Sequence, residues 1–233
     1  MTRYLFWDTD GTLLLTGRAG IFALEAAAER VLGTGAGVQQ MNTAGLTDAE
    51  IVLNIAHGNG HEDPQAVVAD LLDAYTEALP GWLARRSGAV LPNVRETLEA
   101  LSGRSDVVNM LLTGNIAAGA EAKLRHYGLW EFFARTGGAF SVEGADRPAI
   151  ARRARELAAE HGGEVPPGER MVVIGDTPHD VSCGKAIGAR TLAVATGPAY
   201  GLADLEACEP WRAVRQLPAP DEFARLVGLP MAA

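Results

Sequence analysis

The stretch of sequence that decides the fold is residues 4–14, YLFWDTDGTLL. Its apolar start is too short for a helix and leads into two aspartates and a glycine, which predicts a buried strand that opens into a tight turn. Side chains alternate along a strand, so Asp8 and Asp10 point to the same side. At roughly 4 Å two like charges repel by about 4 kcal/mol at an effective dielectric of about 20, so this pair requires a bound metal, a shared proton or wide exposure to solvent. Taken alone, the segment also fits an ordinary Asp-Gly turn after an edge strand.

Composition limits the classes of protein to consider. The chain has 233 residues, enough for one large domain or two modest ones, and its 48% hydrophobic content is ample for a core. A net charge of −9 argues against non-specific nucleic-acid binding. No run approaches the roughly 18 apolar residues of a membrane helix, so we expect a cytoplasmic protein without a membrane partner. Cys183 and Cys208 lack metal-ligand spacing and are expected to be reduced thiols.

The periodicity of apolar residues divides the chain into two parts. Residues 15–88 predict an all-helical insertion, with helices from about residue 21, from Thr47 or Asp48, and from Pro64. Residues 1–14 and 89–233 alternate helices with short apolar strands, which predicts an α/β core with a doubly wound, Rossmann-like parallel sheet. Besides the first strand, the sequence predicts strands at 107–112, 132–135, 171–174 and 191–195, and helices over 117–127 and from 148.

Three of these predicted strands end in polar sequence. Because the carboxyl ends of parallel strands share one edge of the sheet, we expect their polar residues to meet. The acidic side chains expected around one point are Asp8, Asp10, Asp176 and Asp180. A cluster of oxygen ligands without histidine or cysteine suits a hard cation, and Mg²⁺ is the natural choice.

The strand at 107–112 runs into Thr113-Gly114-Asn115. Thr113 supplies a hydroxyl, and Gly114 and Asn115 supply N–H groups near the start of the next helix, where anions commonly bind. These residues therefore predict a phosphate site beside the carboxylates.

On these motifs the chain resembles the haloacid dehalogenase superfamily, in its phosphoglycolate-phosphatase-like branch. The opening motif of the family, two aspartates flanking one residue and followed by Gly-Thr, matches residues 8–12, and the closing acidic motif matches Asp176 and Asp180. Thr113 matches the second motif. The third motif usually has lysine before proline, whereas this chain has Arg147, whose planar fork also suits phosphate. By position and length, residues 15–88 resemble the cap domain of the family.

The resemblance implies a Mg²⁺-dependent phosphatase that hydrolyses a small phosphate monoester, a phosphorylated metabolite, as a monomer or homodimer. It implies that Asp8 attacks phosphorus to form an aspartyl-phosphate and that Asp10 protonates the leaving oxygen and then activates water. Asp8, the carbonyl of Asp10 and Asp176 would hold the metal. Asp180 would ligate the metal, brace Arg147 or cap the following helix. The groups expected to hold the phosphoryl oxygens are those of Thr113, Gly114, Asn115 and Arg147.

Four other activities fit parts of this pattern. A dehalogenase of the superfamily lacks the second aspartate of the opening motif, so Asp10 argues against it. A phosphonate-cleaving relative needs a cap lysine, and residues 15–88 contain none. A phosphosugar mutase shares every core motif and stays open. A non-catalytic phospholigand-binding protein would not need the catalytic carboxylates that this chain keeps.

Several other polar residues have weaker patterns. Lys123 and Lys185, the two lysines of the chain, are expected to be solvated helix residues, and His179 to face solvent. The organic part of the substrate is not revealed by the sequence. The insertion residues that are candidates to contact it are Arg18, Asn42, Thr43, Asn54, His57 and Trp82.

Overall fold

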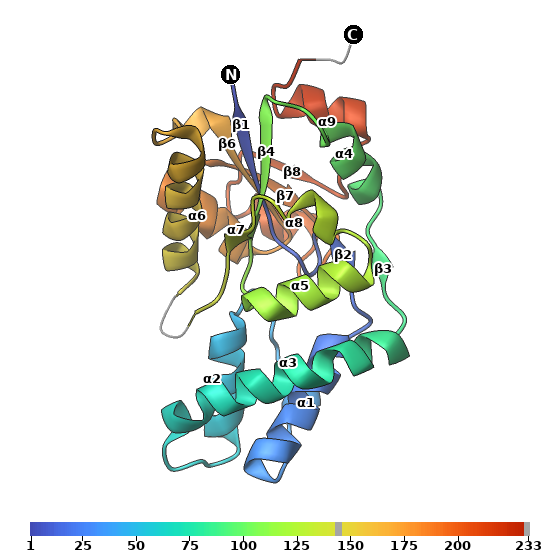
Figure 1. Ribbon diagram of the computed structural model, residues 1–233, viewed down its shortest axis with the longest axis vertical. Coiled ribbons are helices and arrows are strands. Elements are labelled where there is room, and N and C mark those ends of the chain that lie inside the picture. Colours follow the sequence, from blue (N-terminus) through green and yellow to red (C-terminus); the bar gives the residue numbers. More distant parts are fainter. Residues whose placement is uncertain (143–145, 231–233) are drawn as a thin grey trace.

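The computed structural model describes residues 1–142 and 146–230. Its centre is a parallel sheet of six strands in the order β5-β4-β1-β6-β7-β8 (Figure 1). The predicted α/β class with a parallel, Rossmann-like sheet is confirmed. The strands are β1 (Arg3–Trp7), β4 (Val107–Leu112), β5 (Gly138–Ala139), β6 (Met171–Gly175), β7 (Arg190–Val194) and β8 (Arg212–Val214).

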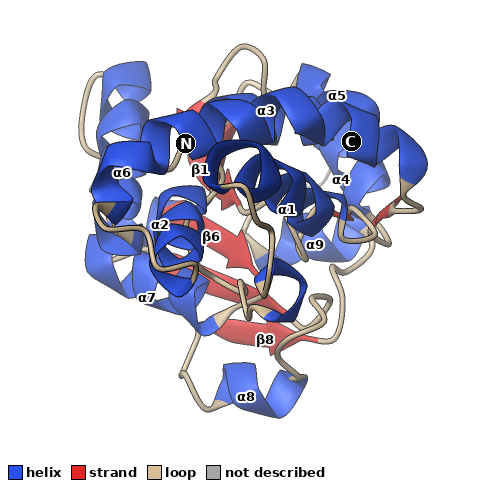
Figure 2. Ribbon diagram, turned by 90° about the horizontal axis from the view of Figure 1, so that it is seen from below, coloured by secondary structure: helices blue, strands red, loops and turns tan. Residues whose placement is uncertain are grey.

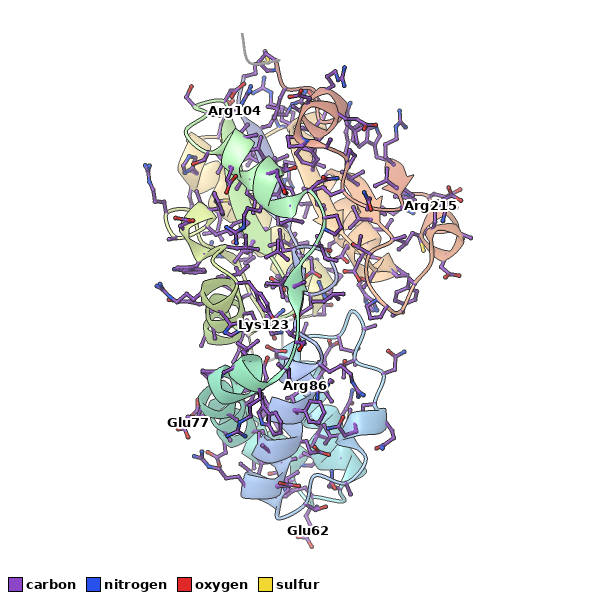
Figure 3. The ribbon with its side chains drawn as sticks, turned by 90° about the vertical axis from the view of Figure 1, so that its right-hand side faces the viewer. Glu62, Glu77, Arg86, Arg104, Lys123 and Arg215 are labelled. Carbon is purple, nitrogen blue, oxygen red and sulfur yellow. The ribbon has the colours of Figure 1, made fainter. Side chains whose placement is uncertain are left out.

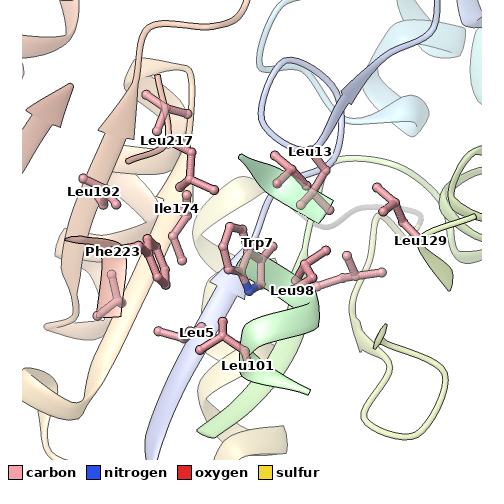
Figure 4. Close-up of a cluster of buried hydrophobic side chains, with 14 of the residues drawn as sticks. Leu5, Trp7, Leu13, Leu98, Leu101, Leu129, Ile174, Leu192, Leu217 and Phe223 are labelled. Carbon is pink, nitrogen blue, oxygen red and sulfur yellow. The ribbon is translucent and has the colours of Figure 1, made fainter. Parts of the chain in front are cut away.

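Helices cover both faces of this sheet, which explains the uninterrupted apolar sequence of β1. Leu5 and Trp7 point to one face, where α4 and α9 pack and Trp7 stacks on Phe223 at 5.5 Å between ring centroids (Figure 4). Tyr4 and Phe6 point to the other face, which α6 and α7 cover. The helices after the first 88 residues are α4 (Val94–Leu101), α5 (Ala117–His126), α6 (Arg147–Gly162), α7 (Pro178–Ile187), α8 (Leu202–Glu206) and α9 (Pro220–Leu226).

The three α-helices between residues 15 and 89 form a separate helical unit with its own apolar core. The unit comprises α1 (Ala19–Leu32), α2 (Asp48–Gly58) and α3 (Val68–Arg85), with short 3-10 turns at Val38–Gln40 and Pro64–Val67. Thr47 caps α2 in a capping box with Glu50, which settles the start of that helix. Figures 1 and 2 show the unit against the edge of the sheet where the strands end, with α5 between.

A two-stranded ribbon joins the helical unit to the sheet. Its strands are β2 (Leu14–Leu15) and β3 (Ala89–Val90), which pair antiparallel. The two connections also touch beyond the ribbon, since a Cβ on Gly88 would lie 2.1 Å from the Leu15 carbonyl oxygen and one on Gly17 would lie 2.0 Å from that of Ser87. Glycine is therefore needed here for the close approach of two backbones.

One predicted strand is corrected by the structure, and one strand was missed. The strand expected at 132–135 is wrong: Trp130–Phe132 form a 3-10 turn that places Phe133 in the core. The fifth strand follows at Gly138, where a Cβ would lie 2.4 Å from the Leu111 carbonyl oxygen, so glycine allows this short strand to pair. The sequence also gave no signal for the short edge strand β8.

No helix within 1–142 and 146–230 is both long and apolar enough to cross a membrane.

Candidate active site

Three buried aspartates converge where β1 and β6 end. Asp8 directly follows β1, Asp176 directly follows β6, and Asp180 lies in the first turn of α7. One carboxylate oxygen of each lies within 4.8 Å of the others. The pairing of β1 with β6, extended by the bond from the Asp8 N–H to the Ile174 carbonyl (2.9 Å), holds the two strand ends together. The structure thus brings together three of the four acidic side chains that the sequence grouped.

The crowding of these carboxylates disfavours their charged forms. Burial and the neighbouring Asp180 raise the pKa of Asp8 to about 7, against the opposing effect of Arg147. Burial and the charge of Asp8 also raise the pKa of Asp176 well above its usual value. The cation beside them is Arg147, whose Nη1 lies 3.3 Å from Asp180 Oδ1 and 3.8 Å from Asp8 Oδ1. When all three aspartates are ionised, their charges and that of the one guanidinium sum to two negative charges, which a divalent cation would balance.

The carboxylate of Asp176 is tightly packed and hydrogen-bonded. Thr12 donates its hydroxyl to Asp176 Oδ1 at 3.1 Å. A Cβ on Gly11 would lie 2.3 Å from Asp176 Oδ2, and one on Gly197 would lie 1.7 Å from the same atom. Gly11 also has a φ of 84°, which L side chains rarely adopt. This fixed carboxylate, with Asp8 beside it, is a donor set suited to Mg²⁺.

Asp180 serves two of the roles that the sequence left open. Its Oδ2 accepts from the N–H and the hydroxyl of Thr177, at 3.0 and 2.7 Å, and so caps α7. Its Oδ1 accepts from Arg147 at 3.3 Å and so braces that guanidinium. Direct ligation of a metal by Asp180 stays a prediction.

Arg147 and the loop after β4 form the other side of the site. Arg147 Nε donates to the Gly45 carbonyl at 2.9 Å, and its Nη2 lies 3.1 Å from the position of a Cβ on Gly114. In the described part of the chain, Nη2 has no hydrogen-bond partner. Thr113 is fully buried behind this loop, and its hydroxyl accepts from the N–H of Asn115 at 3.3 Å. An anion beside Gly114 would therefore meet the free Nη2 of the guanidinium.

A cavity of about 600 Å³ opens over these groups, between the sheet and the helical unit. Its polar floor comes from the sheet side of the molecule, and its walls include apolar side chains of the helical unit. The floor includes Asp8, Asp10, Gly114, Asn115, Arg147 and Asp176, and the apolar wall includes Ile21, Leu24, Met41, Leu46 and Ile51. Such a concave site with a few convergent polar groups is typical of small-molecule binding.

The candidate substrate contacts separate into two groups. Arg18, Asn42 and Thr43 line the cavity. Asn54, His57 and Trp82 are not among the described residues that line it, and Trp82 instead stacks on Phe22 at 5.0 Å. His179 is half-buried against the loop at Gly45, where a Cβ would lie 2.2 Å from its ring.

The helical unit is docked on the sheet through the start of α2. Asp48 donates its N–H to the Gly114 carbonyl at 2.7 Å, and its Oδ2 accepts from the N–H of Ile116 at 2.8 Å. A Cβ on Gly114 would lie 2.7 Å from the Leu46 carbonyl oxygen, so the two loops touch directly. The sequence gave Asp48 only as a possible helix cap.

The prediction that Lys123 is solvated is wrong. Lys123 is 4% exposed, and its Nζ donates to Asp10 Oδ2 at 2.6 Å and to Asn115 Oδ1 at 2.5 Å. Asp10 is thus held by Lys123 and Asn115 and is not one of the three clustered aspartates. The sequence did carry a signal for this burial. Lys123 falls on the same face of the helix as the apolar or small residues Ile116, Ala120 and Leu124. Lys185 is exposed, as expected.

Comparison with known proteins identifies the family. The family model described as haloacid dehalogenase-like hydrolase matches residues 5–185, and the chain belongs to this family. A comparison with curated protein sequences found no match.

Solved structures share the fold over nearly the whole chain. CbbY from Rhodobacter sphaeroides, as a variant in complex with xylulose-(1,5)bisphosphate, has a TM-score of 0.72 and 20% identity over 93% of this chain and 95% of its own. A predicted phosphatase from Clostridium acetobutylicum has a TM-score of 0.70 and 14% identity, covering 97% and 98%. A predicted phosphoglycolate phosphatase from Haemophilus somnus has a TM-score of 0.68 and 16% identity, covering 97% and 96%. At these identities the likeness shows the fold.

The raised pKa of Asp8 predicts how stability depends on pH without metal. Between the usual value of 3.8 and about 7 the folded protein holds a proton that the unfolded chain has lost. This contribution is fully present below about pH 4 and is lost as the pH rises through about 7. In chelator, we expect the melting temperature to fall from about pH 5 to pH 8, and to fall less steeply in Asp176→Asn. Mg²⁺ should raise the melting temperature more at pH 8 than at pH 5; an equal gain at both would contradict this electrostatic account.

Proposed function

We propose that this chain is a Mg²⁺-dependent phosphatase that hydrolyses a small phosphate monoester through an aspartyl-phosphate. The observation that carries the proposal is the set of buried Asp8, Asp176 and Asp180 beside Arg147, under a cavity that also contains Asp10. Membership of a hydrolase family and a fold shared with named phosphatases support it. When bound to Asp8 and Asp176, Mg²⁺ supplies the positive charge that lets a phosphate dianion approach carboxylates.

In the first half of the reaction, a carboxylate oxygen of Asp8 attacks phosphorus and the bond to the ester oxygen breaks. The ester oxygen keeps the electron pair and takes a proton from Asp10, which releases the alcohol. The free Nη2 of Arg147 and the N–H groups at Gly114 and Asn115 hold the phosphoryl oxygens. The guanidinium of Arg147 is already oriented by the Gly45 carbonyl and Asp180 before substrate binds, whereas the Asn115 N–H would have to share or exchange its bond to Thr113.

In the second half, Asp10 is ionised and takes a proton from water, whose oxygen attacks the phosphorus of the aspartyl-phosphate. The bond from phosphorus to Asp8 breaks, which restores the Asp8 carboxylate and releases inorganic phosphate. Asp10 is suited to this exchange because its side chain is 42% exposed and borders the cavity, whereas Asp8 is buried. One carboxylate can therefore act as acid and then as base.

The substrate is proposed to be a small phosphorylated metabolite. A relative at 20% identity was crystallised with a sugar bisphosphate, and the cavity here has room for a ligand of that general size. Arg18, which lines the cavity, donates to the Gln39 carbonyl and forms no ion pair within the described residues. A screen of phosphorylated metabolites with phosphate detection would identify the organic part.

The nucleophile is tested by Asp8→Asn, which conserves size and removes the attacking oxyanion. We expect phosphate release to fall by roughly 10³-fold or more, while the melting temperature in chelator stays equal or rises because a crowded charge is removed. Wild-type turnover should stop in excess chelator and return with Mg²⁺. Turnover by the variant within about tenfold of wild type would show that another residue attacks. Transfer of the phosphoryl group to a sugar phosphate in place of water would identify a mutase.

We also propose that residues 15–88 form a cap domain that moves over the site largely as one body. The helical unit has its own apolar core and joins the sheet through the β2–β3 ribbon. The aspartyl-phosphate must be shielded while it forms and reached by water when it hydrolyses, which a closing and reopening cap would serve. Opening would break the hydrogen bonds of Asp48 with Gly114 and Ile116 and the bond from Arg147 to the Gly45 carbonyl.

Labels on the exposed positions Glu77 of α3 and Arg215 after β8 lie on the two bodies (Figure 3). We expect the distribution of distances between them to narrow when Mg²⁺ and beryllium fluoride, a phosphate mimic, are added. Asp48→Ala, which removes the bond to the Ile116 N–H, should broaden the distribution in the free protein. Distances that stay unchanged across all these states would show that the helical unit does not move relative to the α/β core.

A further inference from the structure

Lys123 is a buried cation that the reaction described above does not use. It lies on α5, at the level where the helical unit meets the sheet (Figure 3), and its side chain is 5% exposed. A lysine is almost never fully buried unless it is paired, so this side chain requires a partner. Its partner is Asp10, 113 positions away in the sequence.

The contacts of Asp10 are divided unequally between its two oxygens. Oδ2 accepts from Lys123 Nζ at 2.6 Å and from Asn115 Nδ2 at 2.9 Å. Oδ1 has no hydrogen-bond partner in the part of the chain that the structure describes. Asn115 is itself fixed, because its Nδ2 also donates to Thr113 Oγ1 at 2.9 Å and its Oδ1 accepts from Lys123. The result is a triangle of Lys123, Asn115 and Asp10 in which one carboxylate oxygen is held and the other is left available.

The charge state of Lys123 excludes a nucleophilic role. Burial by itself lowers its pKa, but the negative charges of Asp10 and Asp48 outweigh burial and raise the pKa above the usual value for lysine. An amine that forms a Schiff base must be neutral. Lys123 is therefore a fixed ammonium group, which binds and orients a carboxylate but does not attack a carbonyl.

We propose that Lys123 is the positioning residue for Asp10: with Asn115 it holds Oδ2, so that Oδ1 meets the leaving oxygen of the substrate. This inference rests on the proposed function and adds a residue to it. The angular freedom of an aspartate side chain at the mouth of a cavity would otherwise let the proton donor turn away, and a misplacement of about 1 Å can cost roughly 10²-fold in rate.

The helical unit surrounds Lys123 from the other side. A Cβ on Gly20 of α1 would lie 3.8 Å from Tyr75 Oη and 3.9 Å from Lys123 Nζ. A Cβ on Gly119, one turn before Lys123 on α5, would lie 3.5 Å from Asp48 Oδ2. Tyr75 of α3 and Asp48 of α2 therefore lie on the side of α5 that faces the helical unit. The docked unit thus shields the ammonium group of Lys123 from water, whereas the Asp10 side chain stays 42% exposed and borders the cavity.

The first test is kinetic and uses Lys123→Met, with Lys185→Met as the matched control because Lys185 is the other lysine and is exposed. In single turnovers with enzyme in excess, Lys123→Met should slow release of an alkyl alcohol by roughly 10²-fold. Release of 4-nitrophenolate, which needs little protonation, should slow by less than about tenfold. Lys123→Arg should recover part of the loss, and the Lys185→Met enzyme should behave as wild type.

Equal losses with both leaving groups, or no loss at all, would overturn the proposal. Equal losses would mean that Lys123 acts on the phosphoryl group or on the fold. Combining Lys123→Met with Asp10→Asn checks the same point, because the lysine change should then cost less than about threefold.

The second test needs no turnover. Labelling lysine with ¹⁵N gives two side-chain ammonium signals, and Lys185→Arg identifies the signal of Lys123. We expect Asp10→Asn to move the Lys123 signal and to leave that of Lys185 in place. A Lys123 signal that does not respond to Asp10→Asn would overturn the positioning role. Absence of phosphatase activity from a wild-type enzyme that shows this response would count against the proposed function and not against the contact.

Discussion

The mutual repulsion of carboxylates buried at the ends of β1 and β6 is the constraint on which the rest of the site depends. The pairing of these two strands fixes Asp8 and Asp176 close together, and α7 adds Asp180. Burial makes the repulsion larger than it would be at the surface, because water screens it less. One guanidinium, that of Arg147, offsets part of the charge and leaves the remainder for a divalent cation.

This constraint explains several sequence features that otherwise look unrelated. Gly11 and Gly197 have no side chain because Asp176 occupies the space where a Cβ would lie. Thr12 faces the same carboxylate and donates to it. Arg147, at the start of α6, reaches both the cluster and the loop of the helical unit at Gly45, so the charge that stabilises the cluster also helps to dock the unit.

Much of the fold was predictable because its signals are local. A strand buried on both faces needs a nearly continuous apolar run. β1 and β6 end in such runs, and the run of β4 is broken only by Asn109, which accepts from the Trp7 indole N–H. The strand β5 was misplaced because its two residues carry no apolar run and depend on the close approach that glycine permits at Gly138. Lys123 was misplaced for a different reason: a lysine on an apolar helix face is stable only with a partner, and Asp10 is distant in the sequence. Such a pair forms only when the tertiary structure brings distant residues together, so the spacing of apolar residues along the sequence does not reveal it.

The site also links its two halves through charge. Asp10 lies apart from the aspartate cluster and is held by a lysine that the helical unit covers, whereas Asp8 belongs to the cluster. The metal side and the proton-transfer side are thus stabilised by different cations, Arg147 and Lys123. The two aspartates therefore have different charged neighbours, as the different roles proposed for them would require.

The most direct measurement of the central claim is calorimetric titration of Mg²⁺ at about pH 6 in buffers that differ in ionisation enthalpy. Because the pKa of Asp8 and that of Asp176 are raised in the metal-free protein, we expect one Mg²⁺ to bind per chain and to release protons. The part of the release that comes from Asp8 should fall at about pH 8, and Asp176→Asn should weaken binding strongly. Binding without proton release at pH 6, or binding unaffected by Asp176→Asn, would contradict the account of a carboxylate cluster that a divalent cation completes.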